Sequence, residues 1–316
     1  MSHDSLTIVE YQSRSQQTDH FPQPDTGGTD ALLGPLLGLA GEVGTLISGY
    51  KKWLRDGAAY ELFKDNVAEE LGDILWYLAN AAEKADLSLN DIARRNLEKT
   101  SDRWRDRGST RPRRRKPSEH FDAGQPRPHR LPRTFTVTIR PFPSDGPEPL
   151  VEVIWKGRRI GDPLGDNTYE DSGYRYHDAF HLANAAVLGW SPVARKIFGC
   201  KRPKGTMTDA VEDGGRAIVV EEGFAAFMFE YASQHDFLED VQHLDYHALR
   251  TFRIFTEGLE VDERHLWEVE EAVFQGFAAW RQLRDNDGGV LRGDLAARRL
   301  TYAPLTEPMS GGSTAP

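Results

Sequence analysis

The stretch AEELGDILWYL, residues 68–78, decides the fold of the first third of this chain. Its apolar residues recur three and four positions apart, which is the period of an α-helix that buries one face. Glu70 and Asp73 stand three positions apart, so a helix projects both carboxylates from one side. Because Leu71 and Ile74 continue the apolar face beside them, these acids border a core, where a charge is costly unless a cation or a base neutralises it.

Helical periodicity continues on both sides of this stretch, through residues 5–104. The spacing predicts one helix over residues 32–53 and a second over residues 60–84. Ser88 is an N-cap residue that opens a third helix running to about residue 103. No strand-like alternation occurs here, so the region predicts an all-α helical bundle.

Glu42 adds a third acid from the helix predicted over residues 32–53, within the sequence GLAGEVGTL. Carboxylates that converge from two helices supply the hard oxygen ligands that Mg²⁺ binds together with phosphates and water. Such an ion polarises a phosphoryl group and activates an attacking water. Acids on amphipathic helices are more often solvated surface charge, so spacing alone leaves both interpretations open.

These motifs resemble those of the MazG-like family of all-α NTP pyrophosphohydrolases, across nearly the whole first region. The family has Glu-x-x-Glu and, further along, Glu-x-x-Asp, where this chain has Glu42-Val-Gly-Thr45 and Glu70-Leu-Gly-Asp73. The remaining matches, in the family's order, are Glu10-Tyr-Gln12 with Thr18, LGLAGEVG followed by Lys51-Lys52, and Asn96 with Lys99, Arg103 and Trp104.

The resemblance implies hydrolysis of a nucleoside triphosphate, with Mg²⁺ or Mn²⁺ as cofactor. It also implies a homodimer or tetramer whose pockets are lined from more than one subunit, and so small a core agrees with a need for a partner. The implied roles are metal ligation by Glu42, Glu70 and Asp73, catalysis by Glu69, Glu70 and Lys99, and substrate binding by Lys51, Asn96, Lys99 and Arg103.

Thr45 departs from the family pattern, because it stands where the family has its second glutamate. A hydroxyl is a neutral and weaker ligand than a carboxylate. Either the site holds fewer metals and still turns over, or the pocket binds nucleotide and hydrolyses it poorly. We favour retained activity, since the three acids and the cationic residues Lys99 and Arg103 remain.

Length and composition divide the chain and exclude several classes of protein. At 316 residues, two domains are expected. Cys200 is the only cysteine, so no intrachain disulfide forms. We expect no apolar run of membrane-spanning length and no signal peptide, which predicts a cytoplasmic protein without a membrane partner. The net charge of −10 argues against a broad nucleic-acid surface.

Prolines, glycines and positive charge dominate residues 107–133, which predicts a basic linker after a first domain at 1–106. Eleven Lys or Arg and four Asp or Glu lie between Ser101 and Arg133. A solvated tether is the favoured interpretation. The alternative is a weak nucleic-acid contact through residues 111–116.

Residues 134–303 predict an α+β second domain, which makes the fold class of the whole chain mainly α. Residues 134–141 and 150–155 alternate with period two around a turn-rich segment, which indicates a β-hairpin. We expect a disordered tail at 304–316. Helices are predicted over residues 174–188, 191–198, 216–233, 246–256 and 263–284.

His177 and His181 stand at i and i+4, a spacing that helical sites use to capture metals. The alternative is a pair of hydrogen-bonded core histidines beside a buried Arg216–Glu222 ion pair. Cys200 precedes Lys201 and Arg202, whose charges could lower its pKa, but a lone Cys without a clear triad is more often inert. The full set of candidates for this second site is His177, Asp178, His181, Asp213, Arg216, Glu221 and Glu222.

Three functional hypotheses follow. The first is an NTP pyrophosphohydrolase. The second is a nucleotide sensor, in which Thr45 weakens hydrolysis and bound nucleotide governs the second domain. The third places metal-dependent chemistry in the second domain, at His177, His181 and Glu222. The second domain vaguely resembles the C-terminal domain of some long MazG-like proteins, which implies no particular activity.

Overall fold

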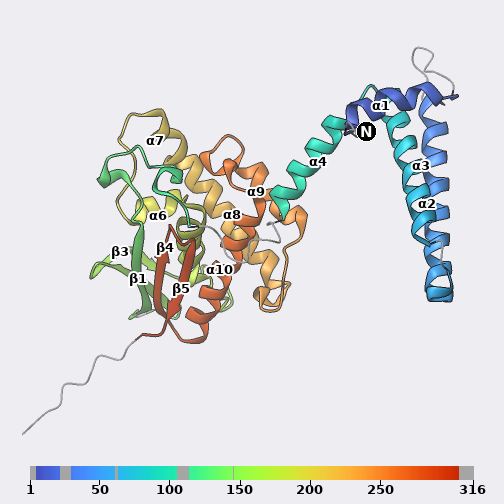
Figure 1. The fold of residues 1–316 in the computed structure, drawn as a ribbon. Helices are drawn as coiled ribbons and strands as arrows, with labels where there is room; N and C mark the ends of the chain where they lie inside the picture. The colour runs from blue at the N-terminus through green and yellow to red at the C-terminus, as the bar shows by residue number, and fades with distance from the viewer. Residues whose placement is uncertain (1–4, 22–29, 61–62, 105–113, 145, 306–316) are drawn as a thin grey trace, which may run out of the picture. The chain divides into compact units, whose positions relative to one another are not determined.

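Helices and an antiparallel sheet make up the computed structural model, which describes residues 5–21, 30–60, 63–104, 114–144 and 146–305 (Figure 1). The chain divides into two compact units, Met1–Thr100 and Ser101–Pro316. The predicted fold class, mainly α with an α+β second domain, is confirmed.

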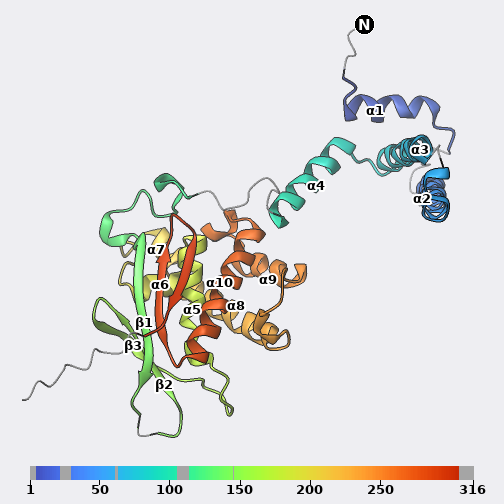
Figure 2. The same cartoon turned by 60° about the horizontal axis from the view of Figure 1, so that its bottom comes forward.

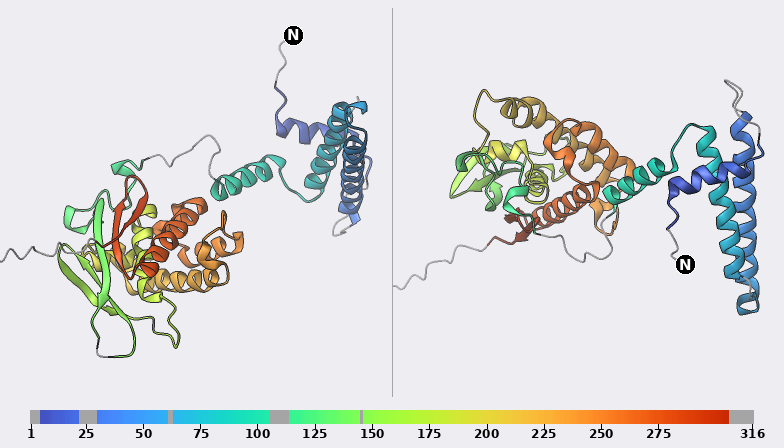
Figure 3. Two further views of the ribbon diagram at one scale, coloured as in Figure 1. Left: turned by 90° about the horizontal axis from the view of Figure 1, so that it is seen from below. Right: turned by 45° about the horizontal axis from the view of Figure 1, so that its top comes forward.

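The first unit is all helical. Thr7 caps its first helix, with a reciprocal hydrogen bond between the Thr7 backbone and the Glu10 side chain. Helices α2 and α3 run side by side along most of their lengths, and α1 packs on α3 (Figures 1 and 3). The elements are α1 (Ile8–Ser15), η1 (Gln16–Thr18), α2 (Asp30–Asp56), η2 (Gly57–Ala59), α3 (Phe63–Lys84) and α4 (Leu89–Arg103), whose last three residues belong to the second unit.

The first unit buries little of its apolar surface. Its core consists of Ala79, Ala82 and Leu89, with Ile8 and Tyr11 packed against them. Large apolar side chains remain exposed along α2 and α3, among them Leu33, Leu36, Leu37, Ile47, Leu54, Leu71 and Leu75. A face of this kind is typical of a surface that another chain covers.

Helix α2 differs from the expectation that no apolar run reaches membrane-spanning length. By length and composition alone, Ala31–Asp56 is apolar enough to cross a membrane, with a mean hydropathy of 1.5. Glycine and threonine interrupt the aliphatic residues without adding charge, so the segment has a high mean hydropathy although it contains no long unbroken aliphatic run. Glu42 lies near the middle of this helix, where a bilayer would impose a large cost on a charged side chain.

The second unit contains a five-stranded antiparallel sheet of order β3-β2-β1-β4-β5. The predicted hairpin is its β1–β2 pair, in which Ile139 lies opposite Val153. Phe135 and Val137 point into the core, while Thr134 and Thr136 point to solvent, as the alternation predicts. The strands are β1 (Thr134–Phe142), β2 (Leu150–Trp155), β3 (Arg158–Leu164), β4 (Gly289–Asp294) and β5 (Arg299–Ala303).

Helices cover one face of this sheet (Figure 2). Helices α5 and α10 pack on each other, and the π-helical segment η6 lies against β4 and β5. Trp280 and Phe277 of α10 are completely or almost completely buried there. The helical elements are η5 (Tyr174–Tyr176), α5 (Asp178–Ala183), η6 (Asn184–Leu188), α6 (Pro192–Ile197), α7 (Met207–Glu212), α8 (Gly215–Ser233), η7 (Asp236–Leu238), α9 (Tyr246–Thr256), η8 (Glu260–Glu263) and α10 (Leu266–Asp285), with η3 (Pro117–Glu119) and η4 (Arg127–His129) preceding the sheet.

Residues 114–133 are part of the second unit, so the predicted linker at 107–133 is wrong from residue 114 onward. Asp122 is buried and accepts hydrogen bonds from the Arg195 side chain at 2.8 Å and the Leu131 backbone at 2.7 Å. The Arg115 side chain is fully buried and donates to the Val187 carbonyl at 2.8 Å. Burial, followed by the nearby Arg264, lowers the pKa of Arg115 to about 9.

This packing also makes two arginines of the basic segment proposed as a nucleic-acid contact less available to a nucleic acid. Within residues 111–116, Arg115 is inside the protein and Arg114 pairs with Asp294 at 3.3 Å. Residues 105–113 lie outside the described part of the chain, as do residues 306–316 of the predicted tail.

Candidate active site and second side-chain cluster

Glu42 of α2 and Glu70 of α3 bring two carboxyl groups together between facing helices. Glu70 is partly buried, and the pKa of its carboxyl is raised, first by burial and then by a shared hydrogen bond and like charge with Glu42. Asp73 and Glu69 raise the Glu70 pKa further through their negative charge. Neighbouring carboxylates repel each other when both are ionised. A bound cation would offset this repulsion.

The residues present fit a divalent cation that prefers oxygen ligands. The Oε2 atom of Glu70 is buried and has no hydrogen-bond partner among the described residues, and such an atom is costly unless an ion or a water satisfies it. Carboxylate oxygens alone suit Mg²⁺ better than softer metals. The site is open, however: within the described part of the chain, three ligand atoms within 4.8 Å of one another occur at His177, Asp178 and His181 rather than at these acids.

Helix α1 is fixed against α3 by the residues of the upstream motif. The Gln12 side chain donates to the Leu87 carbonyl at 2.9 Å and accepts from the Leu89 backbone at 2.7 Å. Trp76 donates to the Thr18 hydroxyl at 2.9 Å. Burial, and then the charge of Asp73, raise the pKa of Tyr11. The motif therefore holds α3 through Trp76 and the turn after α3 through Gln12, and it places a phenol near Asp73.

Thr45 lies on the exposed side of α2, one turn beyond Glu42. Its hydroxyl donates to the Gly41 carbonyl at 3.3 Å, one turn back along its own helix. The side chain is thus engaged locally, and Glu42 has no second acid from its own helix beside it.

The predicted substrate-binding residues are not brought together with the acids. Lys51 stands nine residues after Glu42, roughly 14 Å along the helix at 1.5 Å per residue. Asn96 and Lys99 are exposed on α4, and no contact with the carboxylates is found for them among the residues described. Their roles stay predictions.

Arg103 forms buried contacts that the sequence analysis did not predict. Its guanidinium lies in the second unit, where it donates to Glu270 at 3.3 Å and to the Leu244 carbonyl at 2.9 Å. The residue is buried, and two of its guanidinium nitrogens donate these hydrogen bonds. These contacts give Arg103 a structural role, and its role toward the triphosphate stays a prediction.

Comparison with known protein families accounts for both units. The MazG nucleotide pyrophosphohydrolase domain matches residues 35–107, and the MazG C-terminal domain matches residues 116–306. The chain belongs to the MazG family. Among relatives of this MazG family member, the Gene 37 protein of Mycobacterium phage L5 is 36% identical over 101 residues, which are 31% of this chain and 88% of that protein. No solved structure matches the chain.

The C-terminal domain of this MazG family member contains a second cluster of chemically capable side chains. His177, Asp178 and His181 each place a ligand atom within 4.8 Å of the others, as the predicted spacing requires. They lie where η5 passes into α5. His181 is completely buried, and Asp178 is nearly so.

Two glutamates of α8 complete this cluster. Nδ1 of His181 lies 3.2 Å from Oε1 of Glu221, and its Nε2 lies 3.2 Å from Oε2 of Glu222. Burial alone would lower the pKa of His181, but the two carboxylates outweigh it and raise the pKa to about 10. Without another cation, His181 is therefore an imidazolium at neutral pH.

Residues that the sequence analysis did not single out hold Glu221 in place. Its Oε2 accepts from the Ser191 hydroxyl and the Val193 backbone, both at 3.0 Å, and its Oε1 accepts from Asn184 at 3.1 Å. Ser191 before Pro192 is a readable N-cap signal for α6. The contact of Ser191 with Glu221, thirty positions away, cannot be predicted from the sequence around either residue.

Asp213 and Arg216 do not belong to this cluster. Asp213 accepts from the Arg202 backbone and side chain at 2.6 and 2.9 Å. Arg216 is exposed, and within the described ranges it forms no ion pair with Glu222, so the proposed buried Arg216–Glu222 pair is wrong. Burial raises the pKa of Cys200 to about 11, which favours the inert cysteine over one activated by Lys201 and Arg202.

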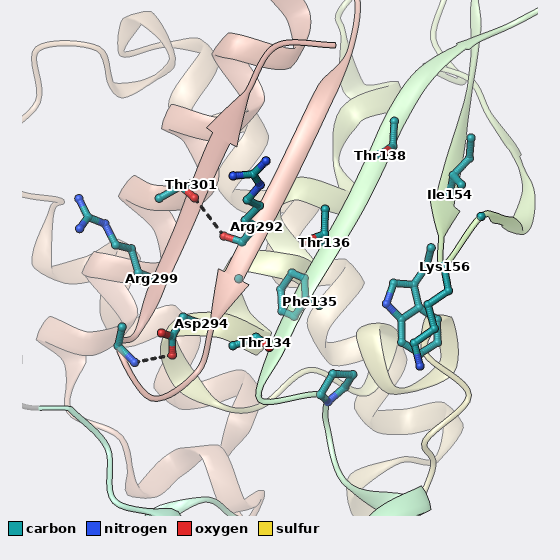
Figure 4. A pocket seen from close by; sticks show the side chains of 15 residues that line it. Thr134, Phe135, Thr136, Thr138, Ile154, Lys156, Arg292, Asp294, Arg299 and Thr301 are labelled. Carbon is teal, nitrogen blue, oxygen red and sulfur yellow. Dashed lines mark hydrogen bonds between the residues drawn. The ribbon is translucent and has the colours of Figure 1, made fainter. Parts of the chain in front are cut away.

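The outer face of the sheet holds a shallow hollow of about 980 Å³ (Figure 4). Threonines of β1 and Arg292, Arg299 and Thr301 line it, and Thr301 donates to the Arg292 carbonyl at 3.3 Å. Asp294 at its rim caps the following turn through the Ala296 and Ala297 backbone. None of the predicted site residues lies in this hollow.

Proposed function

We propose that this protein hydrolyses nucleoside triphosphates to nucleoside monophosphate and pyrophosphate, with Mg²⁺ or Mn²⁺ as its cofactor, in the cytoplasm. The observation that carries the proposal is the Glu42–Glu70 pair, which joins two helices and leaves a buried carboxylate oxygen without a partner. The match to the MazG nucleotide pyrophosphohydrolase domain supports the class of reaction.

Glu42, Glu70 and Asp73 would hold the metal in this mechanism. When bound, the metal supplies charge neutralisation to the phosphates and lowers the pKa of a coordinated water. Glu69 is exposed beside Glu70 and takes the proton of the attacking water. The water oxygen bonds to the α-phosphorus, and the bond from that phosphorus to the α–β bridging oxygen breaks. Lys99 and Asn96 bind the polar groups of the substrate, and the pyrophosphate leaves with the bridging oxygen.

The enzyme acts as a homodimer or tetramer. The apolar side chains exposed along α2 and α3 exceed what one small helical unit can bury, and a second copy would cover them. A partner subunit would also close the acids off from solvent, which strengthens their interaction with a cation.

A pyrophosphate-release assay with Mg²⁺ and a panel of NTPs and dNTPs tests this proposal. Glu70→Gln and Asp73→Asn should abolish release, because each removes a charged ligand. Asp65→Asn is the matched control, since Asp65 is exposed in the first turn of the same helix. Release of orthophosphate alone, or unchanged release by Glu70→Gln, would contradict the assignment.

A nucleotide sensor is the second candidate function. It is favoured by one observation, that Thr45 turns its hydroxyl to the Gly41 carbonyl and supplies no charge at the position of the family's second glutamate. Tight, metal-dependent nucleotide binding without turnover would establish it in place of hydrolysis.

A further inference from the structure

Both histidines of the second cluster present the same ring nitrogen to a common point. Nδ1 of His177 lies 2.9 Å from the Tyr174 carbonyl oxygen, and Nδ1 of His181 lies 3.2 Å from Oε1 of Glu221. An acceptor at Nδ1 favours the tautomer that carries its proton there. On His177 this leaves the lone pair of Nε2 free. On His181, Nε2 hydrogen-bonds to Oε2 of Glu222 at 3.2 Å, so a metal ion would take the place of the proton between these two atoms.

Glu222 stands opposite these two nitrogens. Its Oε2 lies 3.2 Å from Nε2 of His181 and 4.0 Å from Nε2 of His177. Ligand atoms at the corners of a tetrahedron with bonds of 2.0–2.1 Å are about 3.3 Å apart. The observed separations are therefore close to those of a bound metal, and His177 needs only a small movement to reach it.

Asp178 adds a carboxylate to the two imidazoles. The residue as a whole is only 7% exposed. One of its oxygens lies within 4.8 Å of ring nitrogens of His177 and His181, so all three side chains can offer a ligand atom to one ion. A cation at the cluster would also lower the cost of holding this charge largely inside the protein.

We propose that the two imidazoles, with the carboxylates of Asp178 and Glu222, bind one divalent transition metal ion, Zn²⁺ before Mn²⁺ or Fe²⁺. Two imidazole nitrogens and carboxylate oxygens form a donor set for this class of metal. The acids of the first unit, which offer oxygen alone, suit Mg²⁺. The two units therefore select different ions.

The surroundings of the cluster are arranged to hold its ligands still. The Tyr174 ring stacks on His177 with centroids 4.5 Å apart and an angle of 9°. Glu221, behind His181, is fixed by its hydrogen bonds to α6 and η6. The π-helical turn of η6 begins directly after α5, and such turns are frequent at functional sites.

One side of the cluster faces solvent. The side chain of Glu222 is 42% exposed and that of His177 is 13% exposed, while His181 is closed off. The exposed side gives an ion a path into the cluster, while the four proposed ligands would fill the tetrahedral coordination that zinc prefers.

The competing interpretation is a metal-free ion cluster, in which a protonated His181 neutralises Glu221 and Glu222. This interpretation leaves Nε2 of His177 with a contact of 4.0 Å to Oε2 of Glu222, which is longer than a hydrogen bond. It also makes a distinct prediction, that the chain has no affinity for zinc in the second unit.

Zinc titration by calorimetry and metal analysis of the full chain separate the two interpretations. The titrations are made in the Glu70→Gln background, to weaken binding at the first unit. We expect one zinc ion per chain, with His177→Gln and Glu222→Gln each weakening binding by at least about 10-fold. The matched controls are His247→Gln, an exposed histidine of α9, and Glu230→Gln, an exposed glutamate on the same helix as Glu222.

Thermal unfolding in EDTA, with and without later addition of zinc, checks that each variant folds. Zinc should raise the melting temperature of the parent and of both controls, and leave that of His177→Gln and Glu222→Gln unchanged. If His177→Gln does not fold, the more exposed Glu222→Gln decides alone. Zinc binding that is absent from the parent, or equally tight in parent and Glu222→Gln, overturns the proposal.

Discussion

Oε1 of Glu221 lies 3.2 Å from Nδ1 of His181, and neither side chain is exposed to solvent. The same carboxylate accepts from Ser191 and from the Val193 backbone, so it ties three segments of the second unit together. Removing a buried acceptor costs stability mainly because its hydrogen-bond donors are then left buried without a partner.

Glu221→Gln should therefore destabilise the second unit by roughly 2–3 kcal/mol, because one amide NH₂ must face groups that themselves donate. Urea unfolding followed by tryptophan fluorescence measures the change. Glu230→Gln on the same helix should stay within about 0.5 kcal/mol of the parent. Equal stabilities of the two variants would show that the buried contacts of Glu221 add nothing.

Thr45→Glu should strengthen metal binding in the first unit. The new carboxylate stands one helical turn after Glu42 and restores the family's Glu-x-x-Glu. We expect the Mg²⁺ concentration for half-maximal pyrophosphate release to fall by about 10-fold, equivalent to roughly 1.4 kcal/mol. Ser48→Glu, one turn further along the exposed side of α2, controls for added charge. The same fall in both variants would assign the effect to bulk electrostatics.

Arg103→Met should reduce stability and leave nucleotide binding unchanged. It breaks the buried pair with Glu270 and removes the donor to the Leu244 carbonyl, at a cost of roughly 3 kcal/mol. Lys99→Met should do the reverse, raising KM for the nucleotide without affecting unfolding. A raised KM in Arg103→Met at unchanged stability would restore the role that the family pattern implied.

His120 should make the second unit less stable in acid. Burial, and then Arg133 and Arg115, lower the pKa of His120 to about 4 from its ordinary 6.5. The unfolded chain therefore binds the proton more readily, so the stability due to neutral His120 is complete above pH 6.5 and is lost as the pH falls towards 4. The loss is roughly 3 kcal/mol.

Urea unfolding at pH 7.5 and pH 5 tests this prediction. His120→Gln should lose less stability than the parent between the two values, since the substituted side chain does not titrate. His247→Gln, at an exposed histidine, should follow the parent. A pH dependence that is unaltered by His120→Gln would mean that other groups carry it.

The helices of the first unit were predictable because their apolar residues follow one period without a break. Strands β4 and β5 were not, because their sequences contain glycine and charge where an isolated strand would have apolar residues. Gly293 and Gly289 leave the space that the rings of Phe135 and Tyr302 occupy: a Cβ at either glycine would lie 2.1 Å from a ring atom. That reason for glycine exists only after the sheet has formed.

The candidate sites divide in the same way. The four-residue spacing of His177, the N-cap of α5, and His181 within α5 was enough to predict that they meet, since helix geometry is local. The partners of Asp213 and Arg103 could not be predicted, because they are set by tertiary packing. The Arg103–Glu270 contact joins residues 167 positions apart, and no local pattern carries it.

The pairing of Asp122 with Arg195 has a practical consequence for where the second unit can be cut. A fragment beginning at Thr134, the first residue of β1, would lack Asp122 and would leave the Arg195 guanidinium buried beside Cys200 with one counterion fewer. It would also lose Arg115, which fills the space next to Gly189. A fragment meant to fold independently should therefore begin before Arg114. The start predicted from composition, residue 134, is about twenty residues further along the chain.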